Sequence, residues 1–224
     1  MDVATNLERI NQNIRQACEN SGRNPAEITV IGVTKYVTIE RAKEAINAGI
    51  TNLGENRLEG LLAKYEYIQD DASWHFIGTL QSRKVKDVID KVDVIHSLDR
   101  MSLAKELNKR SSRPVDCFVQ VNVSGEESKH GIGADDAVSF IKELKQYPNI
   151  QVVGLMTMAP HIDDEAYLRN IFRKLASLRE AVKAEQLQHA PCNYLSMGMT
   201  NDYKIAIEEG ATHIRIGSAL VGPQ

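Results

Sequence analysis

The sequence predicts a single (β/α)8 barrel of the TIM type, with one helix before the first strand. From Ile28 onward, short β-rich apolar runs alternate with amphipathic stretches of helical period, which is the pattern of a parallel sheet covered by helices. The length of 224 residues is close to the roughly 250 residues of such barrels. The main rival, a doubly wound open sheet, is disfavoured because no G-x-G-x-x-G follows the first run, which ends in Thr34-Lys35-Tyr36.

The helix before the first strand is expected within residues 1–22, where Val3, Leu7, Ile10 and Ile14 recur at helical intervals among polar side chains. No apolar core with a cleavage site is visible there, so we expect no secretory signal. No linker rich in Pro, Gly or Ser and no repeat divides the chain. Residues 1–224 are therefore expected to form one domain, with residues 1–22 packing on the barrel.

Eight strands are expected, at residues 28–33, 52–54, 75–78, 94–97, 117–123, 152–157, 194–197 and 213–216. The helices between them are expected to begin close to capping or acidic residues, near Thr38, Asn56, Gln81, Arg100, Ala134, Asp163 and Asn201. The strands of a barrel are parallel, so their carboxyl ends form one face. Active sites of this fold lie on that face.

Charge and cysteine content exclude several classes of protein. With 27 Lys and Arg against 30 Asp and Glu, the net charge is −3, which disfavours a general binder of nucleic acids or anionic membranes. No apolar run approaches the roughly 20 residues of a membrane-spanning helix. Cys18, Cys117 and Cys192 are far apart, odd in number and without metal-type spacing. A reducing cytoplasm is therefore the expected location.

Lys35 directly follows the first apolar run and is expected at the carboxyl end of the first strand. Partial desolvation there disfavours the ammonium form, and a free amine can attack a carbonyl to form a Schiff base. A lone lysine at a strand end is more often a rim residue whose stem covers apolar surface. Lys35 therefore needs companions before it indicates a site.

Two segments late in the chain supply these companions. Residues 196–202 and 215–218 follow the last two expected strands and combine glycines with hydroxyl residues, so that backbone N–H groups and hydroxyls can bind an anion. Barrels commonly bind phosphate at this place. Arg215 ends an apolar strand and is expected to point into the barrel mouth, with a salt bridge to Glu55 or Asp202 as the alternative.

A Schiff-base lysine, a phosphate site and an inward arginine together fit pyridoxal 5′-phosphate (PLP). The aldehyde would join Lys35, and Arg215 would face the ring nitrogen. An arginine there would keep the nitrogen unprotonated and make the ring a weak electron sink. This arrangement predicts modest or no carbanion chemistry.

Many short motifs occur in one order over nearly the whole chain: Gly32-Val-Thr-Lys35, Gly54-Glu-Asn56, Trp74-His-Phe-Ile-Gly78, Leu80-Gln-Ser82, Gln120-Val-Asn122, Ser128-Lys129-His-Gly131, Gly154-Leu-Met156, Ser196-Met-Gly-Met-Thr200-Asn-Asp202 and Arg215-Ile-Gly217. With these motifs the sequence resembles the pyridoxal phosphate homeostasis protein family. That family binds PLP on a barrel like the N-terminal domain of alanine racemase.

The resemblance implies a set of cofactor contacts and a physiological role. Lys35 would carry PLP as an internal aldimine, and Arg215 would approach the pyridine nitrogen. The remaining contacts implied are a phosphate site formed by Ser196, Gly198, Thr200, Gly217 and Ser218, and a pocket wall that includes Asn56 and Met156. The family's role implies a non-catalytic cytoplasmic protein of vitamin B6 metabolism that buffers PLP and passes it to apo-enzymes.

Two features depart from the family's pattern. Tyr36-Val-Thr follows Lys35 where a proline and small residues are expected, so the wall beside the lysine is expected to differ in shape. The sequence ends at Pro223-Gln224, soon after the last expected strand. The final helix of the barrel is therefore expected to be short or absent.

Two enzymatic alternatives stay open. An amino-acid racemase of the alanine racemase type needs a second acid/base opposite the lysine. The racemase domain that supplies a tyrosine across a dimer has no counterpart here, which favours a monomer, and only Tyr36 and Tyr203 fall near the expected site. The other alternative is a Schiff-base aldolase without cofactor, which a lysine and a phosphate site would serve equally.

The histidines could instead form a metal site. His75, His96 and His161 lie at strand ends, and a barrel could bring them together as in a metal-dependent hydrolase. No H-x-H or H-E-x-x-H spacing occurs. We therefore expect these histidines to be hydrogen-bonded within strands and loops, and we expect no metal.

Overall fold

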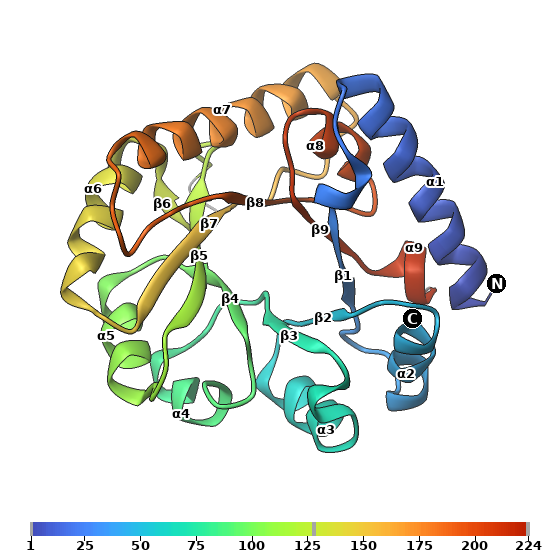
Figure 1. Ribbon diagram of the computed structural model, residues 1–224, viewed down its shortest axis with the longest axis horizontal. Coiled ribbons are helices and arrows are strands. Elements are labelled where there is room, and N and C mark those ends of the chain that lie inside the picture. The colour runs from blue at the N-terminus through green and yellow to red at the C-terminus, as the bar shows by residue number, and fades with distance from the viewer. Residues whose placement is uncertain (1, 127–128, 223–224) are drawn as a thin grey trace.

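The chain folds into a closed parallel β-barrel surrounded by helices, as the computed structural model in Figure 1 shows. The structure describes residues 2–126 and 129–222, so Ser128 of the expected motifs and the terminal Pro223 and Gln224 lie outside the described residues. The barrel strands are β1 (Thr29–Val33), β2 (Asn52–Glu55), β3 (Ser73–Phe76), β4 (Val94–Leu98), β5 (Val115–Asn122), β7 (Ile150–Met156), β8 (Tyr194–Met199) and β9 (His213–Ile216).

Closure of the sheet confirms the predicted barrel. The strands follow the order β4-β3-β2-β1-β9-β8-β7-β5, and pairing of β4 with β5 completes the ring. Each neighbouring pair is parallel. The carboxyl ends of all these strands therefore open on one rim.

The expected strands are all present, and the last, 213–216, has the expected bounds, whereas the others are displaced at one or both ends. The third differs most clearly, since the prediction of 75–78 is two residues late. β3 pairs with β2 from Ser73, opposite Asn52, to Phe76, opposite Glu55. An additional short strand, β6 (Ile132–Gly133), pairs with the end of β5 and was not predicted.

Helices cover the outside of the barrel (Figure 1). Their bounds are α1 (Val3–Ser21), α2 (Ile39–Asn47), α3 (Leu58–Ile68), α4 (Val85–Val88), α5 (Met101–Arg110), α6 (Ala137–Glu143), α7 (Glu165–Ala184), α8 (Tyr203–Glu208) and α9 (Ser218–Val221). The connection between β3 and β4 is weakly helical, because α4 is a single turn that follows a 3-10 turn at Ser82–Lys84. Within the described residues, no helix is both long enough and apolar enough to cross a membrane.

The last helix of the described residues, α9, is a single turn. α1 contacts α9 and α8 on the outer surface and covers this part of the barrel in its place (Figure 1). Asn6 Nδ2 donates to the backbone oxygen of Leu220 at 2.9 Å. Arg23, just beyond α1, donates from Nη1 to the backbone oxygens of Ile207 and Ala211, each at 2.7 Å. The N-terminal helix thus completes the helical layer.

We expect Arg23→Ala to lower the free energy of unfolding by about 2 kcal/mol, because it removes charge-assisted hydrogen bonds to two backbone carbonyls. Urea unfolding followed by circular dichroism measures the change. Arg15→Ala is the control, since Arg15 is exposed on the adjoining helix α1. Equal stability of the two variants would contradict the role given to Arg23.

Candidate functional site

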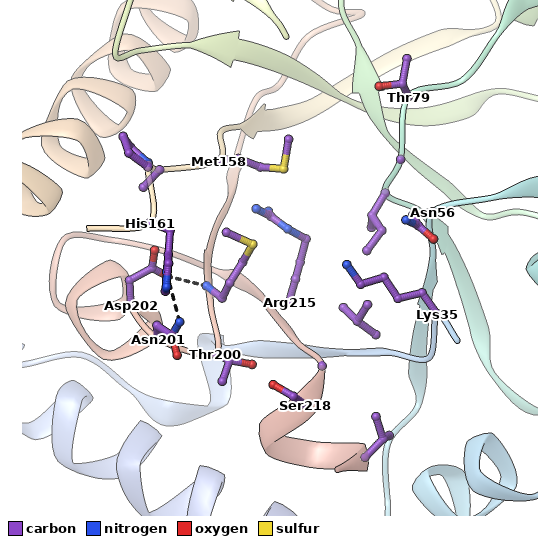
Figure 2. A pocket seen from close by; sticks show the side chains of 18 of the residues that line it. Lys35, Asn56, Thr79, Met158, His161, Thr200, Asn201, Asp202, Arg215 and Ser218 are labelled. Atoms are coloured by element: carbon purple, nitrogen blue, oxygen red, sulfur yellow. Dashed lines mark hydrogen bonds between the residues drawn. The ribbon is translucent and has the colours of Figure 1, made fainter. Parts of the chain in front are cut away.

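A cavity of about 540 Å³ opens at the carboxyl ends of the barrel strands. This volume lies within the roughly 300–1,000 Å³ of small-molecule sites. Figure 2 shows the Lys35 side chain extending across the cavity toward Arg215, with Thr200 and Ser218 at one end. The predicted site residues that line the cavity are Lys35, Asn56, Thr200, Arg215, Gly217 and Ser218.

In the described chain, the other predicted site residues lie outside this lining. Met156 and Ser196 are fully buried in β7 and β8. At Gly198, φ is 97° and a Cβ would lie only 2.6 Å from Ala206 Cβ, so the packing of α8 already requires glycine there. Contacts of Met156, Ser196 and Gly198 with a cofactor stay a prediction.

A buried ion pair fixes the backbone that carries Lys35. Glu55, 1% exposed, lies 2.9 Å from Lys64 Nζ through its Oε1. The same oxygen accepts a hydrogen bond from Thr34 Oγ1 at 2.7 Å. Thr34 immediately precedes Lys35, so the ion pair on β2 and α3 holds the end of β1. Tyr36, on the other side of the lysine, has φ 67° and is 56% exposed.

Arg215 is buried at the base of the cavity, with 4% of its surface exposed. Its Nη1 donates to Ser196 Oγ at 2.5 Å, and its Nη2 donates to the backbone oxygen of Thr157 at 3.0 Å. Burial lowers the pKa of Arg215 to about 10, an effect that the nearby Asp202 carboxylate partly offsets. The guanidinium is therefore still a cation at neutral pH.

The salt bridge considered as an alternative for Arg215 is not formed. Glu55 pairs with Lys64 instead. Among the residues that the structure describes, no carboxylate oxygen lies within 4.0 Å of the Arg215 guanidinium. Arg215 thus keeps hydrogen-bonding capacity for a ligand in the cavity.

A tight turn after β8 presents Thr200 to the cavity. Asp202 Oδ1 accepts a hydrogen bond from the backbone N–H of Met199 at 2.6 Å, and the N–H of Asp202 donates to the oxygen of Met199 at 3.1 Å. Burial raises the pKa of Asp202. His161 reaches this turn from the loop after β7, with its Nδ1 3.3 Å from Asn201 Nδ2, as Figure 2 shows.

Comparison with known proteins identifies the family. The family model described as alanine racemase, N-terminal domain, matches residues 5–224. The pyridoxal phosphate homeostasis protein of Aquifex aeolicus is 41% identical over 226 residues, which cover 99% of this chain and 98% of the relative. This chain belongs to the pyridoxal phosphate homeostasis protein family.

Solved structures agree with this family membership. PipY of Synechococcus elongatus PCC7942, with PLP bound, superposes with a TM-score of 0.81 and is 29% identical, covering 94% of this chain and all of PipY. Alanine racemase of Clostridium difficile 630 shares the fold, with a TM-score of 0.76, 15% identity, and coverage of 98% of this chain but 56% of the racemase.

Sequence reasoning missed part of the cavity wall. The loops after β3 and β7 contribute residues that no expected contact included, among them Ile77, Thr79, Met158, Pro160 and His161. The motif 74–78 pointed to the first loop, because it ends at a strand terminus. In the second loop only His161 was considered, as a metal ligand, because the other lining residues are apolar and carry no chemical signal.

We expect Lys64→Met to lower the free energy of unfolding by about 3–5 kcal/mol, because it leaves the Glu55 carboxylate buried without its cation. The double variant Glu55→Gln with Lys64→Met should recover most of that loss, since the glutamine is neutral and its carbonyl can still accept from Thr34. Urea unfolding compares the three proteins. A double variant as unstable as Lys64→Met would contradict this account.

Proposed function

We propose that this chain binds PLP, holds it covalently and reversibly through Lys35, and serves intracellular PLP homeostasis without catalytic turnover. The observation that carries the proposal is the convergence of Lys35, Arg215 and the hydroxyls of Thr200 and Ser218 in one cavity. The name of the relatives, at up to 41% identity over nearly their whole length, supports it. PLP bound to PipY on the same fold supports it as well.

Gly217 is the proposed position of the cofactor's phosphate. A Cβ added at this glycine would meet no protein atom closer than 3.7 Å, the Cβ of Val33. Packing within the chain therefore does not require glycine, although Gly217 lines the cavity. Because Gly217 has no side chain, a phosphate can approach its backbone closely. Thr200 and Ser218 would donate hydrogen bonds to the phosphate from their hydroxyls.

Arg215 is proposed to face the ring nitrogen. A guanidinium only donates hydrogen bonds, so its partner must be an unprotonated acceptor. Bound PLP supplies an aldehyde for a primary amine and a ring that can withdraw electrons. By holding the ring nitrogen unprotonated, Arg215 limits that electron withdrawal, which suits a carrier better than an enzyme.

The tyrosines favour the carrier over the racemase. Efficient racemisation needs a second acid/base on the face opposite the lysine. Of the two tyrosines near the site, Tyr36 is largely exposed, and the hydroxyl of Tyr203 accepts a hydrogen bond from Asn13 Nδ2 at 2.8 Å. No tyrosine among the described residues lines the cavity.

We further propose a cytoplasmic monomer that passes PLP to apo-enzymes. Cys18, Cys117 and Cys192 are buried and unpaired, which suits a reducing compartment. The open mouth of the cavity allows a small cofactor to leave. Light scattering tests the monomer, and reactivation of an apo-enzyme by the loaded protein tests delivery.

We expect Lys35→Ala to abolish the absorbance band that PLP produces with the wild-type protein, together with the adduct that borohydride fixes, because the attacking amine is gone. Lys43→Ala, on the exposed face of α2, is the control and should keep both. A reducible adduct that persists in Lys35→Ala would show that another lysine holds PLP. A wild-type protein that stays colourless with PLP would favour the aldolase.

We expect Gly217→Val to weaken PLP binding at least about tenfold, because the side chain fills the proposed phosphate position. Titration of absorbance measures affinity. Addition of pyridoxal, which has no phosphate, serves as the control and should be bound equally by both proteins. An equal loss for both ligands would contradict a phosphate at Gly217.

A further inference from the structure

A chain of hydrogen bonds runs through the barrel interior behind Arg215. Ser196 Oγ, which accepts from Arg215, lies 2.9 Å from His96 Nδ1. His96 Nε2 lies 2.8 Å from His75 Nδ1, and His75 Nε2 lies 2.9 Å from Asn52 Oδ1. We call Arg215, Ser196, His96, His75 and Asn52 the buried histidine chain. β4 and β8 are not neighbours in the sheet, so the bond between His96 and Ser196 crosses the interior.

The proton positions in the buried histidine chain follow from its two ends. Arg215 only donates, so Ser196 Oγ accepts from it and turns its own hydrogen to His96 Nδ1. His96 must then donate from Nε2 to His75 Nδ1, and His75 must donate from Nε2 to Asn52 Oδ1. Asn52 Nδ2 donates to Thr51 Oγ1 at 3.0 Å, which is consistent with Oδ1 facing His75. Both imidazoles are assigned as neutral rings protonated at Nε2.

Burial supports this assignment. His75 and His96 are 2% and 0% exposed. Desolvation, and to a lesser degree the neighbouring His213, lowers the pKa of His75 to about 3. Desolvation followed by the neighbouring His75 and Arg215 lowers the pKa of His96 well below its ordinary value. Neither ring is a cation at neutral pH.

The direction of the buried histidine chain suits a buried cation. Each O–H or N–H bond points away from Arg215, so the acceptor end of each dipole points toward the guanidinium. A buried charge needs such compensation when a carboxylate does not pair with it. Ser196 and the backbone oxygen of Thr157 are the direct acceptors, and the two histidines fix the rotation of the serine hydroxyl.

We propose that His75 and His96 are positioning residues that hold Arg215 as a fixed hydrogen-bond donor to the ring nitrogen of the bound cofactor. This inference rests on the PLP binding proposed above. Asn52 ends the series and has no proton that it can exchange with a ring. The buried histidine chain is therefore a static support, and Arg215 offers the ring nitrogen a hydrogen bond and not a proton.

Packing fixes the orientation of the His96 ring, which lies in the middle of the buried histidine chain. Phe118 stacks on His96 with ring centroids 4.4 Å apart and an angle of 19° between the rings. His213 also contacts Phe118, at 5.1 Å between centroids, but its Nδ1 pairs with Thr212 Oγ1 at 2.9 Å, outside the chain. His213 is thus a matched control for His96, because it contacts the same phenylalanine but, within the described residues, forms no hydrogen bond with the buried histidine chain.

The first experiment uses the 15N-labelled wild-type protein without added cofactor. Long-range 1H–15N NMR correlations report the protonation of each ring nitrogen. At neutral pH we expect both His75 and His96 as neutral Nε2–H tautomers. An imidazolium, or a proton on Nδ1 of either ring, would overturn the assigned direction and with it the proposal.

The second experiment compares PLP complexes of His96→Phe, Ser196→Ala and the control His213→Phe. His96→Phe and Ser196→Ala should bind PLP about tenfold more weakly, the effect of losing a hydrogen bond to a charged group. Their absorbance band should also change with pH across the neutral range, because a loosened Arg215 no longer keeps the ring nitrogen unprotonated. The control should match the wild type.

The outcomes separate the inference from the proposed function. A folded Ser196→Ala variant with wild-type affinity and a wild-type response to pH would overturn the positioning role, even if His96→Phe fails to fold. If Ser196 instead binds phosphate, Ser196→Ala would weaken PLP but leave pyridoxal binding and the pH response unchanged, which also overturns it. A wild-type protein that binds no PLP refutes the proposed function, whereas the NMR result still decides the proton positions.

Discussion

Parallel pairing between β1 and β9 is the contact on which the site depends. Ile31 lies opposite Arg215 in this ladder, and the next residues of β1 lead to Lys35. Two residues 180 positions apart in the sequence therefore come to one rim, because parallel strands must end on the same side. The pairing of β4 with β5 at the opposite part of the ring makes this rim a closed mouth. A cofactor site then requires only suitable side chains at strand ends.

The interior of this barrel differs from the branched aliphatic layers typical of the fold. Its buried polar residues include His75, His96, Ser196 and Arg215. Polar groups in such a place are costly unless each is hydrogen-bonded. Here hydrogen bonds join these four side chains into one series, so each buried polar group has a polar partner. Substituting any of these residues by an apolar one leaves its hydrogen-bond partners buried without a partner.

Sequence reasoning could predict the barrel and the residues at strand ends. It could not predict how deep in the barrel a given side chain lies. Lys35 follows an apolar run directly and Arg215 lies near the end of the last expected strand, so their place toward the carboxyl ends of the strands follows from the ends of these runs. Ser196 also follows from alternation as an inward residue, but alternation cannot say how far below the mouth it lies. Depth is set by the stagger between strands, and here it places Ser196 beneath Arg215 and away from the cavity lining.

The histidines show the same limit. The expectation that His75 and His96 are hydrogen-bonded within the fold is confirmed. Their connection to each other could not be predicted, because their strands lie 21 residues apart and only the register of β3 on β4 brings the rings together. The loop after β7 was missed for a different reason, since apolar residues such as Met158 carry no chemical signal.

The burial of the cysteines has a consequence for the proposed binding of an aldehyde. Thiolates are strong nucleophiles and could compete with Lys35 for such a group. Burial raises the pKa of Cys192 to about 12, and it also raises the pKa of Cys18 and Cys117. These sulfurs are therefore both inaccessible and protonated at neutral pH. The proposed aldehyde ligand would therefore not be lost to reaction at these sulfurs, and it would stay chemically intact for the proposed release.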